Sequence, residues 1–191
     1  MTHAPRPEER LERPYQEQLA RAGRLYGRVL QRAVPLRGAD GKPTDIDSRI
    51  IDYEDDVWSF FIHCWHVRDW LKHDTTVDAA ARDRALRAAE DSQWLQVCAD
   101  LANGRKHFEL RRSRVGAGPS TVRASWTYGA TEWTLELYVQ VSDARPEPVA
   151  AAELAWQALR AWTQILDAEQ LPMPPGFPDL TTAPRVSVPA C

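Results

Sequence analysis

The sequence predicts a mainly α-helical protein, an up-down four-helix bundle with a β-hairpin inserted before the last helix. Three observations predict this fold. Apolar residues recur every three or four positions through most of the chain, as on the buried face of an amphipathic helix. The segment from residue 47 or 52 to about residue 73 is apolar on nearly all sides, which is typical of a helix at the centre of a bundle. Residues 121 to 141 instead alternate between apolar and polar, the pattern of a two-stranded hairpin.

The predicted helices follow from the apolar spacing and from the residues that end each run. The first covers residues 8 to 33 and closes before Pro35. The second begins near residue 47 or 52 and ends near His73. The third extends from Val77 to about residue 112, with an N-cap at Asp74 and an interruption near Ser92 left open. The last helix follows two prolines and ends before Pro172.

The bulk composition fits one globular domain. The chain has 191 residues, of which 43% are hydrophobic and 27% are charged, so it can bury a core without disulfides or metals. We expect a single helical-bundle domain over residues 1–170, including the hairpin at about 121–141. Residues 171–191 are predicted to be a proline-rich tail without regular structure.

Charge and cysteine content narrow the classes of function. The formal net charge of −3 gives no global positive field of the kind that drives non-specific binding to nucleic acid. Three cysteines without a C-x-x-C pair do not form a disulfide framework and favour a cytoplasmic location. The sequence predicts neither a membrane-spanning segment nor a cofactor.

A polar stripe on the third predicted helix is the main candidate site. Asp100, Asn103 and His107 fall on one helical face, which places a carboxylate, an amide and an imidazole within two turns. A histidine can act as general acid or base, and Arg105 and Lys106 would supply positive charge for a phosphate. The alternative interpretation is structural, with buried polar groups that hydrogen-bond and set the register of the helices.

The layout and the Asn103-x-x-x-His107 spacing resemble the HEPN superfamily of small helical-bundle proteins. The resemblance implies a homodimer that binds RNA, and in some members cleaves it without a metal ion. Asn103 and His107 match the polar residue and the histidine of the family motif, whereas Ala102 stands where the motif has arginine. A stretch such as residues 58 to 70, followed by residues 98 to 107, also looks like a family of uncharacterised bacterial proteins.

A second group of polar residues lies on the second predicted helix. Its members are three or four positions apart and form a narrow seam on an apolar rod: Asp56, Ser59, His63, His66, Asp69 and His73. We predict that His63, His66 and Asp69 contribute to ligand binding. One alternative is a metal site built from the three histidines with Asp69. Another is that the histidines hydrogen-bond Asp100 or Asn103 across the helix interface, or line a dimer contact.

Two further groups of residues have mainly structural interpretations. The aromatic residues of the hairpin either stack on bases, line an apolar ligand pocket or cover the bundle: Trp126, Tyr128, Trp133 and Tyr138. Cys64 and Cys98 lie among apolar residues and are predicted to fill the core. The function that the sequence favours is thus binding of RNA or another phosphate-bearing ligand. The rival functions are a non-catalytic interaction module and a histidine-rich metal-binding bundle.

Overall fold

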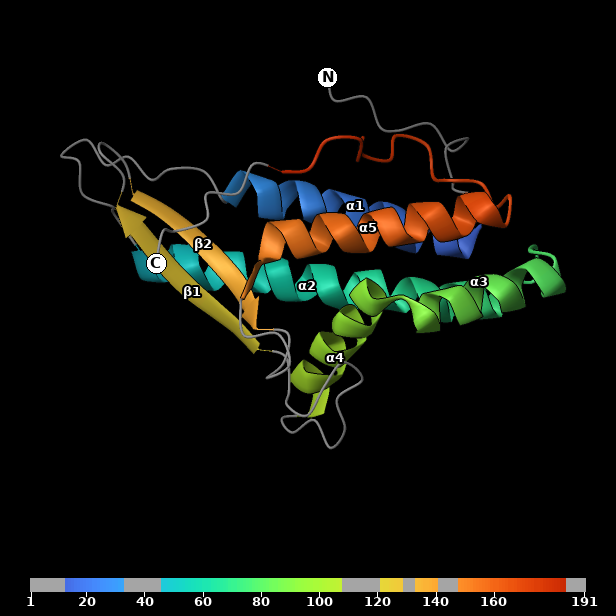
Figure 1. Ribbon diagram of the computed structural model, residues 1–191, viewed down its shortest axis with the longest axis horizontal. Coiled ribbons are helices and arrows are strands. Elements are labelled where there is room, and N and C mark those ends of the chain that lie inside the picture. The colour runs from blue at the N-terminus through green and yellow to red at the C-terminus, as the bar shows by residue number, and fades with distance from the viewer. Residues whose placement is uncertain (1–12, 33–45, 108–120, 129–132, 141–147, 185–191) are drawn as a thin grey trace, which may run out of the picture.

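The computed structural model describes residues 13–32, 46–107, 121–128, 133–140 and 148–184 (Figure 1). Its elements in chain order are α1 (Pro14–Arg32), α2 (Ile46–His73), α3 (Ala79–Asp91), α4 (Gln93–His107), β1 (Thr121–Tyr128), β2 (Trp133–Gln140), β3 (Val149–Ala150) and α5 (Ala151–Ala168). The protein is therefore mainly helical, with a hairpin before the last helix, which confirms the predicted fold class.

Helix α2 is the centre of the bundle. It packs against α1, α3, α4 and α5, which explains why its sequence is apolar on nearly all sides. Phe60 and Phe61 are fully buried and meet edge to face at 5.2 Å, and Trp162 of α5 donates from Nε1 to the carbonyl oxygen of Cys64 at 3.0 Å. Of the helices in the described ranges, none is long and apolar enough to cross a bilayer.

The third predicted helix is divided in two at Ser92. Ser92 has an extended backbone with ψ near 115°, and its N–H still donates to the carbonyl oxygen of Ala88 at 3.0 Å. Its own carbonyl oxygen accepts from the N–H of Gln96 at 2.9 Å and starts α4. Because of this break, α4 turns away from the line of α3 (Figure 1). The predicted continuation of the helix to residue 112 lies outside the described residues.

The predicted N-cap at Asp74 is wrong, and the cap is Asp78. The Asp78 carboxylate accepts from the N–H of Ala81 at 2.9 Å, which satisfies a donor of the first turn of α3. Asp74 instead holds the turn after α2, because its Oδ1 accepts from both the N–H and the hydroxyl of Thr76.

The hairpin predicted at residues 121 to 141 is confirmed and belongs to a small antiparallel sheet. β1 and β2 pair in a register that sets Thr121 opposite Gln140 and Tyr128 opposite Trp133. The short strand β3 pairs with the other edge of β2, with Tyr138 opposite Ala150. β3 leads directly into α5, so the sheet positions the start of the last helix.

Beyond α5 the chain folds back on the bundle instead of leaving it (Figure 1). Gln170 has a positive φ of 54°, and the N–H of Leu171 donates to the carbonyl oxygen of Leu166 at 2.8 Å. These features form a Schellman motif, which reverses the chain at the helix end. Leu171 is buried, so packing continues past the predicted domain boundary at residue 170.

Candidate functional site

The predicted stripe lies on α4, which is helical from Gln93 through His107. Asp100 is fully buried and Asn103 is half-buried. The described part of the stripe therefore passes from the core at Asp100 to a half-buried position at Asn103. The side chains of Arg105, Lys106 and His107 lie outside the described residues, so their predicted roles stay predictions.

Asp100 is a carboxylate within the hydrophobic core. Its neighbours in the helix, Ala99 and Leu101, are also fully buried. Removing a carboxylate from water costs several kcal/mol unless polar partners compensate. Asp100 does have an interaction partner. Its burial supports a positioning or structural role for this end of the stripe.

His63 contacts α1 and not the stripe on α4. The side-chain amide of Gln18, which is buried, donates from Nε2 to the His63 carbonyl oxygen at 3.1 Å and lies 2.9 Å from the ring Nδ1. The hydrogen bonds that the structure describes for His63 go to Gln18 and not to Asp100 or Asn103.

The surroundings of His63 favour its neutral form. Burial lowers the pKa of the ring, and the positive charge of Arg21 and the neighbouring His66 lower it further. The Gln18 amide acts in the same direction, because an amide N–H that faces Nδ1 needs an unprotonated nitrogen as its acceptor.

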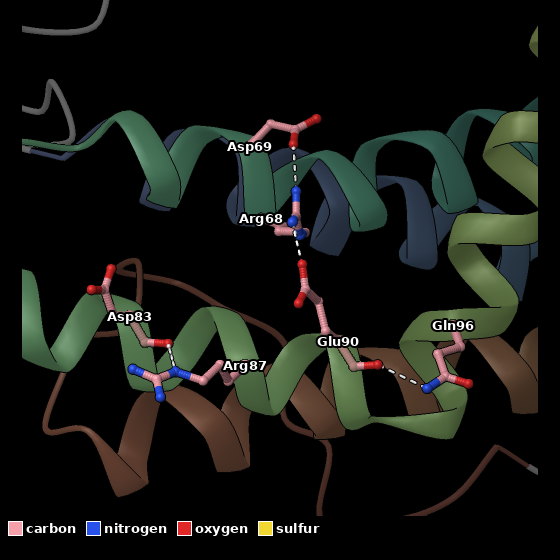
Figure 2. A network of polar contacts seen from close by, with 6 residues as sticks. All are labelled: Arg68, Asp69, Asp83, Arg87, Glu90 and Gln96. Carbon is pink, nitrogen blue, oxygen red and sulfur yellow. Dashed lines mark hydrogen bonds and ion pairs between the residues drawn. The ribbon is translucent and has the colours of Figure 1, made fainter. Parts of the chain in front are cut away.

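Asp69 belongs to a surface network that joins α2 to α3 (Figure 2). Its carboxylate lies 3.3 Å from Nη1 of Arg68, and the same guanidinium pairs with Glu90 of α3. Arg68 also lies over the ring of Trp65, with 5.5 Å from Cζ to the ring centroid. Gln96 extends the network to α4 by donating to the Glu90 carbonyl oxygen at 2.8 Å.

The remaining seam residues point to no metal centre. His66 is half-buried and His73 is exposed at the last turn of α2. Within the part of the chain that the structure describes, no group of three or more His, Cys, Asp or Glu side chains is arranged to hold a metal ion. The histidine-based metal site thus has no support from this geometry.

The two cysteines of the bundle form a buried pair between α2 and α4. Cys64 and Cys98 are both fully buried, as predicted. Burial raises the pKa of the Cys98 thiol well above its usual range, and its hydrogen bond with the Cys64 thiol raises it further. A thiol that stays protonated is a poor nucleophile, which supports a packing role.

The aromatic residues of the hairpin are only partly described. Tyr138 on β2 is buried, which favours the interpretation that it covers the bundle. The side chains of Trp126, Tyr128 and Trp133 lie outside the described residues.

Sequence reasoning missed Gln18, the partner of His63. A signal was present, because Gln18 falls among Tyr15, Leu19 and Ala22, the residues that mark the buried face of α1. A polar residue on such a face needs a polar partner. The sequence did not indicate which residue, 45 positions away, would supply it.

Comparison with known proteins gives no further assignment. The chain matches no protein-family model, no curated protein and no solved structure.

Proposed function

We propose that the protein binds RNA, or another phosphate-bearing ligand, at the C-terminal half of α4 and cleaves it without a metal ion. The supporting observation is the continuity of α4 through His107. Gly104 could have ended the helix, since glycine is unfavourable in helices by about 1 kcal/mol relative to alanine. Because the helix continues, Asn103 and His107 are one turn apart on the same face, the spacing of the HEPN-like motif.

The proposed chemistry uses the three stripe residues in different roles. His107 exchanges a proton with the attacking or leaving oxygen as general acid or base. Asn103 offers an amide to orient the phosphate or the imidazole, and the buried Asp100 positions this part of the helix. Arg105 and Lys106 follow in the same turn and supply the charge that a phosphate requires. In keeping with the resemblance, we propose that the active form is a homodimer.

Cleavage of single-stranded RNA in the presence of a chelator tests the catalytic part. We expect His107→Ala to lower the rate at least about 100-fold, the usual contribution of general acid–base catalysis. His73→Ala is the matched control, because His73 is an exposed histidine on another helix, and it should leave the rate unchanged. Equal rates for wild type and His107→Ala, or no cleavage by wild type, would refute the catalytic claim.

Salt-dependent RNA binding tests the ligand part. The double variant Arg105→Ala with Lys106→Ala should bind RNA more weakly. The slope of log affinity against log salt should become shallower by roughly 1.4, as expected for two lost contacts to single-stranded phosphates. The control replaces Arg24 of α1 and Arg87 of α3, two exposed arginines on other helices, and should keep the wild-type slope. An unchanged slope for the α4 variant would show that the C-terminal half of α4 is not the RNA-binding surface.

The full burial of Asp100 favours one alternative, a non-catalytic interaction module in which the stripe is structural. In that case neither wild type nor His107→Ala cleaves RNA, and His107→Ala lowers the melting temperature. Measuring melting temperature and cleavage on the same preparations separates the two functions.

A further inference from the structure

The chain that follows α5 is a proline-rich segment that lies along two helices. Four of the eight residues from Leu171 onward are proline: Pro172, Pro174, Pro175 and Pro178. Residues 171–184, which we call the C-terminal segment, form neither helix nor strand and run back along the bundle (Figure 1). Proline has no N–H to donate, so such a chain cannot build its own regular hydrogen bonding and its position depends on contacts with other elements.

The contacts come from α1 and α5, on what we call the α1–α5 surface: Tyr15, Gln16, Gly23 and Trp156. The Tyr15 hydroxyl donates to the Pro172 carbonyl oxygen at 2.8 Å. The Gln16 amide donates to the same oxygen at 3.2 Å and to that of the next residue at 3.3 Å. Farther along, Trp156 donates from Nε1 to the Leu180 carbonyl oxygen at 3.1 Å. Both ends of the segment are thus held by side-chain donors.

Apolar side chains of the C-terminal segment pack between these hydrogen bonds. Leu171 is buried, and three further side chains are partly buried against the hydrophobic core: Met173, Phe177 and Leu180. The segment comes close to the backbone of α1 at Gly23, where an added Cβ would lie 3.0 Å from Cδ of Pro178. The α1–α5 surface therefore combines hydrogen-bond donors with apolar contacts.

The direction of the hydrogen bonds indicates what this surface recognises. Among the described residues, each side-chain hydrogen bond from α1 or α5 to the segment ends on a main-chain carbonyl oxygen. Proline keeps its carbonyl oxygen while it lacks the N–H. Surfaces lined with aromatic side chains are a common means of binding proline-rich peptides. The α1–α5 surface has this chemistry, and the chain's own segment occupies it.

The way in which the segment is attached allows it to be exchanged. The N–H of Leu171 donates to the Leu166 carbonyl oxygen. Beyond that residue, the hydrogen bonds described between the segment and the helices all come from side chains. The segment can therefore leave the surface without breaking the main-chain hydrogen bonds of α1 or α5.

We propose that the α1–α5 surface is a docking site for a proline-rich segment of another protein, and that residues 171–184 occupy it as an intramolecular competitor. Because the competitor belongs to the same chain, its effective concentration is on the order of millimolar, and a partner binds by displacing it. The proposal concerns α1 and α5 and does not depend on RNA binding at α4, so either can fail without the other.

A labelled synthetic peptide with the sequence of residues 171–184 is the probe for such a partner. The released variant is the full chain with Phe177→Asp and Leu180→Asp, which places charge on two apolar contacts of the segment and leaves α1 and α5 unchanged. In fluorescence anisotropy, the peptide should bind the released variant about tenfold or more tightly than wild type, whose own segment competes. The same peptide carrying both aspartates is the control and should bind neither protein.

A second peptide tests the preference for proline. In this peptide alanine replaces the four prolines, so the free peptide loses the restricted backbone that proline provides. We expect it to bind the released variant more weakly than the native peptide. Leu180→Asp alone changes one side chain and should bind the native peptide with an affinity between those of wild type and the released variant. That comparison remains valid even where the double variant is unstable.

Two glycines of α1 test where the peptide binds. In the released variant, Gly23→Ala should weaken peptide binding, because a Cβ at this position meets the ring of Pro178. Gly27→Ala is the matched control and should leave the affinity unchanged, because a Cβ there meets nothing within 4 Å.

Several results would overturn the proposal. Failure of the released variant to bind the native peptide would exclude docking at this surface. Equal binding of the native and the alanine peptide would exclude recognition of proline-rich chains, and equal effects at Gly23 and Gly27 would place the peptide elsewhere. If wild type sedimented as a dimer and the released variant as a monomer, the occupant would be the segment of a second copy and not that of another protein.

Discussion

At the scale of single residues, the contact between Gln18 and His63 favours the neutral form of a half-buried imidazole. One amide nitrogen faces both the His63 carbonyl oxygen and the ring Nδ1. The carbonyl oxygen can only accept, so the amide must present its N–H groups here, and Nδ1 must carry a lone pair. The ring proton is therefore on Nε2, and a second proton would break this contact.

This contact predicts a specific pH dependence of stability. The pKa of His63 in the folded protein lies below its ordinary value of 6.5, so the unfolded chain binds the proton more tightly. The free energy of unfolding should therefore fall as the pH drops from 6.5 toward the lower folded pKa. In His63→Gln this decline should be reduced, because glutamine does not titrate. Urea unfolding across neutral and mildly acidic pH measures the effect.

His73→Gln provides the control for the pH experiment. His73 is exposed at the end of α2, so the variant should decline with acidification as wild type does. If His63→Gln and wild type gave parallel profiles, the contact with Gln18 would not control the protonation of His63.

At the scale of elements, the two glycines of α1 have different surroundings although they are one turn apart. A Cβ added at Gly23 would lie 3.0 Å from Cδ of Pro178 and 3.3 Å from Cε2 of Phe177. A Cβ added at Gly27 would meet nothing within 4 Å. Gly23 therefore allows residues 171–184 to approach α1 closely, whereas Gly27 has no such role.

Alanine at the two positions should change stability in opposite directions. Gly27→Ala should raise the free energy of unfolding by about 0.4–1 kcal/mol, because alanine favours the helix and restricts the unfolded chain. Gly23→Ala should lose this gain and be destabilising, because the rigid ring of Pro178 has to move. Chemical denaturation of the two variants measures the difference, with Gly27→Ala as the internal control. If both substitutions stabilised the protein equally, Phe177 and Pro178 would not restrict the space beside Gly23.

The break at Ser92 shows how far local sequence specifies an element. The periodicity around Ser92 predicted helix on both sides and left an interruption open. Locally, either a continuous or a broken helix is acceptable, because serine is only moderately unfavourable within a helix. Packing decides, since α3 and α4 each contact α2 and α5 and α4 follows a different direction (Figure 1).

At the scale of the whole molecule, residues 171–184 bind the start of α1 to α5. The Tyr15 hydroxyl donates to the Pro172 carbonyl oxygen at 2.8 Å, and the Gln16 amide donates to the same oxygen at 3.2 Å. Further along, Trp156 of α5 donates from Nε1 to the Leu180 carbonyl oxygen at 3.1 Å. A segment of the predicted proline-rich tail is thus part of the packed structure.

We expect the protein to need this segment for stability. Ending the chain after residue 170 should lower the melting temperature, because it removes Leu171 from the core and leaves polar groups of Tyr15 and Trp156 without their acceptors. Leu171→Ala should reproduce part of the loss, about 2–5 kcal/mol for a buried leucine. Thermal unfolding followed by circular dichroism compares the three chains. An unchanged melting temperature on truncation would mean that the segment contributes nothing to the fold.

The sequence by itself determined the fold class, the positions of the main helices, the hairpin and the burial of Cys64 and Cys98. These features follow from apolar periodicity and from local signals at element ends, which act between residues close together in the chain. On the same basis the sequence predicted that one continuous helix carries Asn103 and His107 and that the two residues share a face of it.

Only the tertiary structure decided which distant groups meet. Gln18 reaches His63, Tyr15 reaches Pro172 and Trp162 reaches Cys64 across separations of 45, 157 and 98 positions. A buried polar group requires a partner, but neither its residue type nor its position in the sequence determines which residue that partner is. That choice depends on how the helices pack, and packing set Gln18 of α1 against His63 of α2.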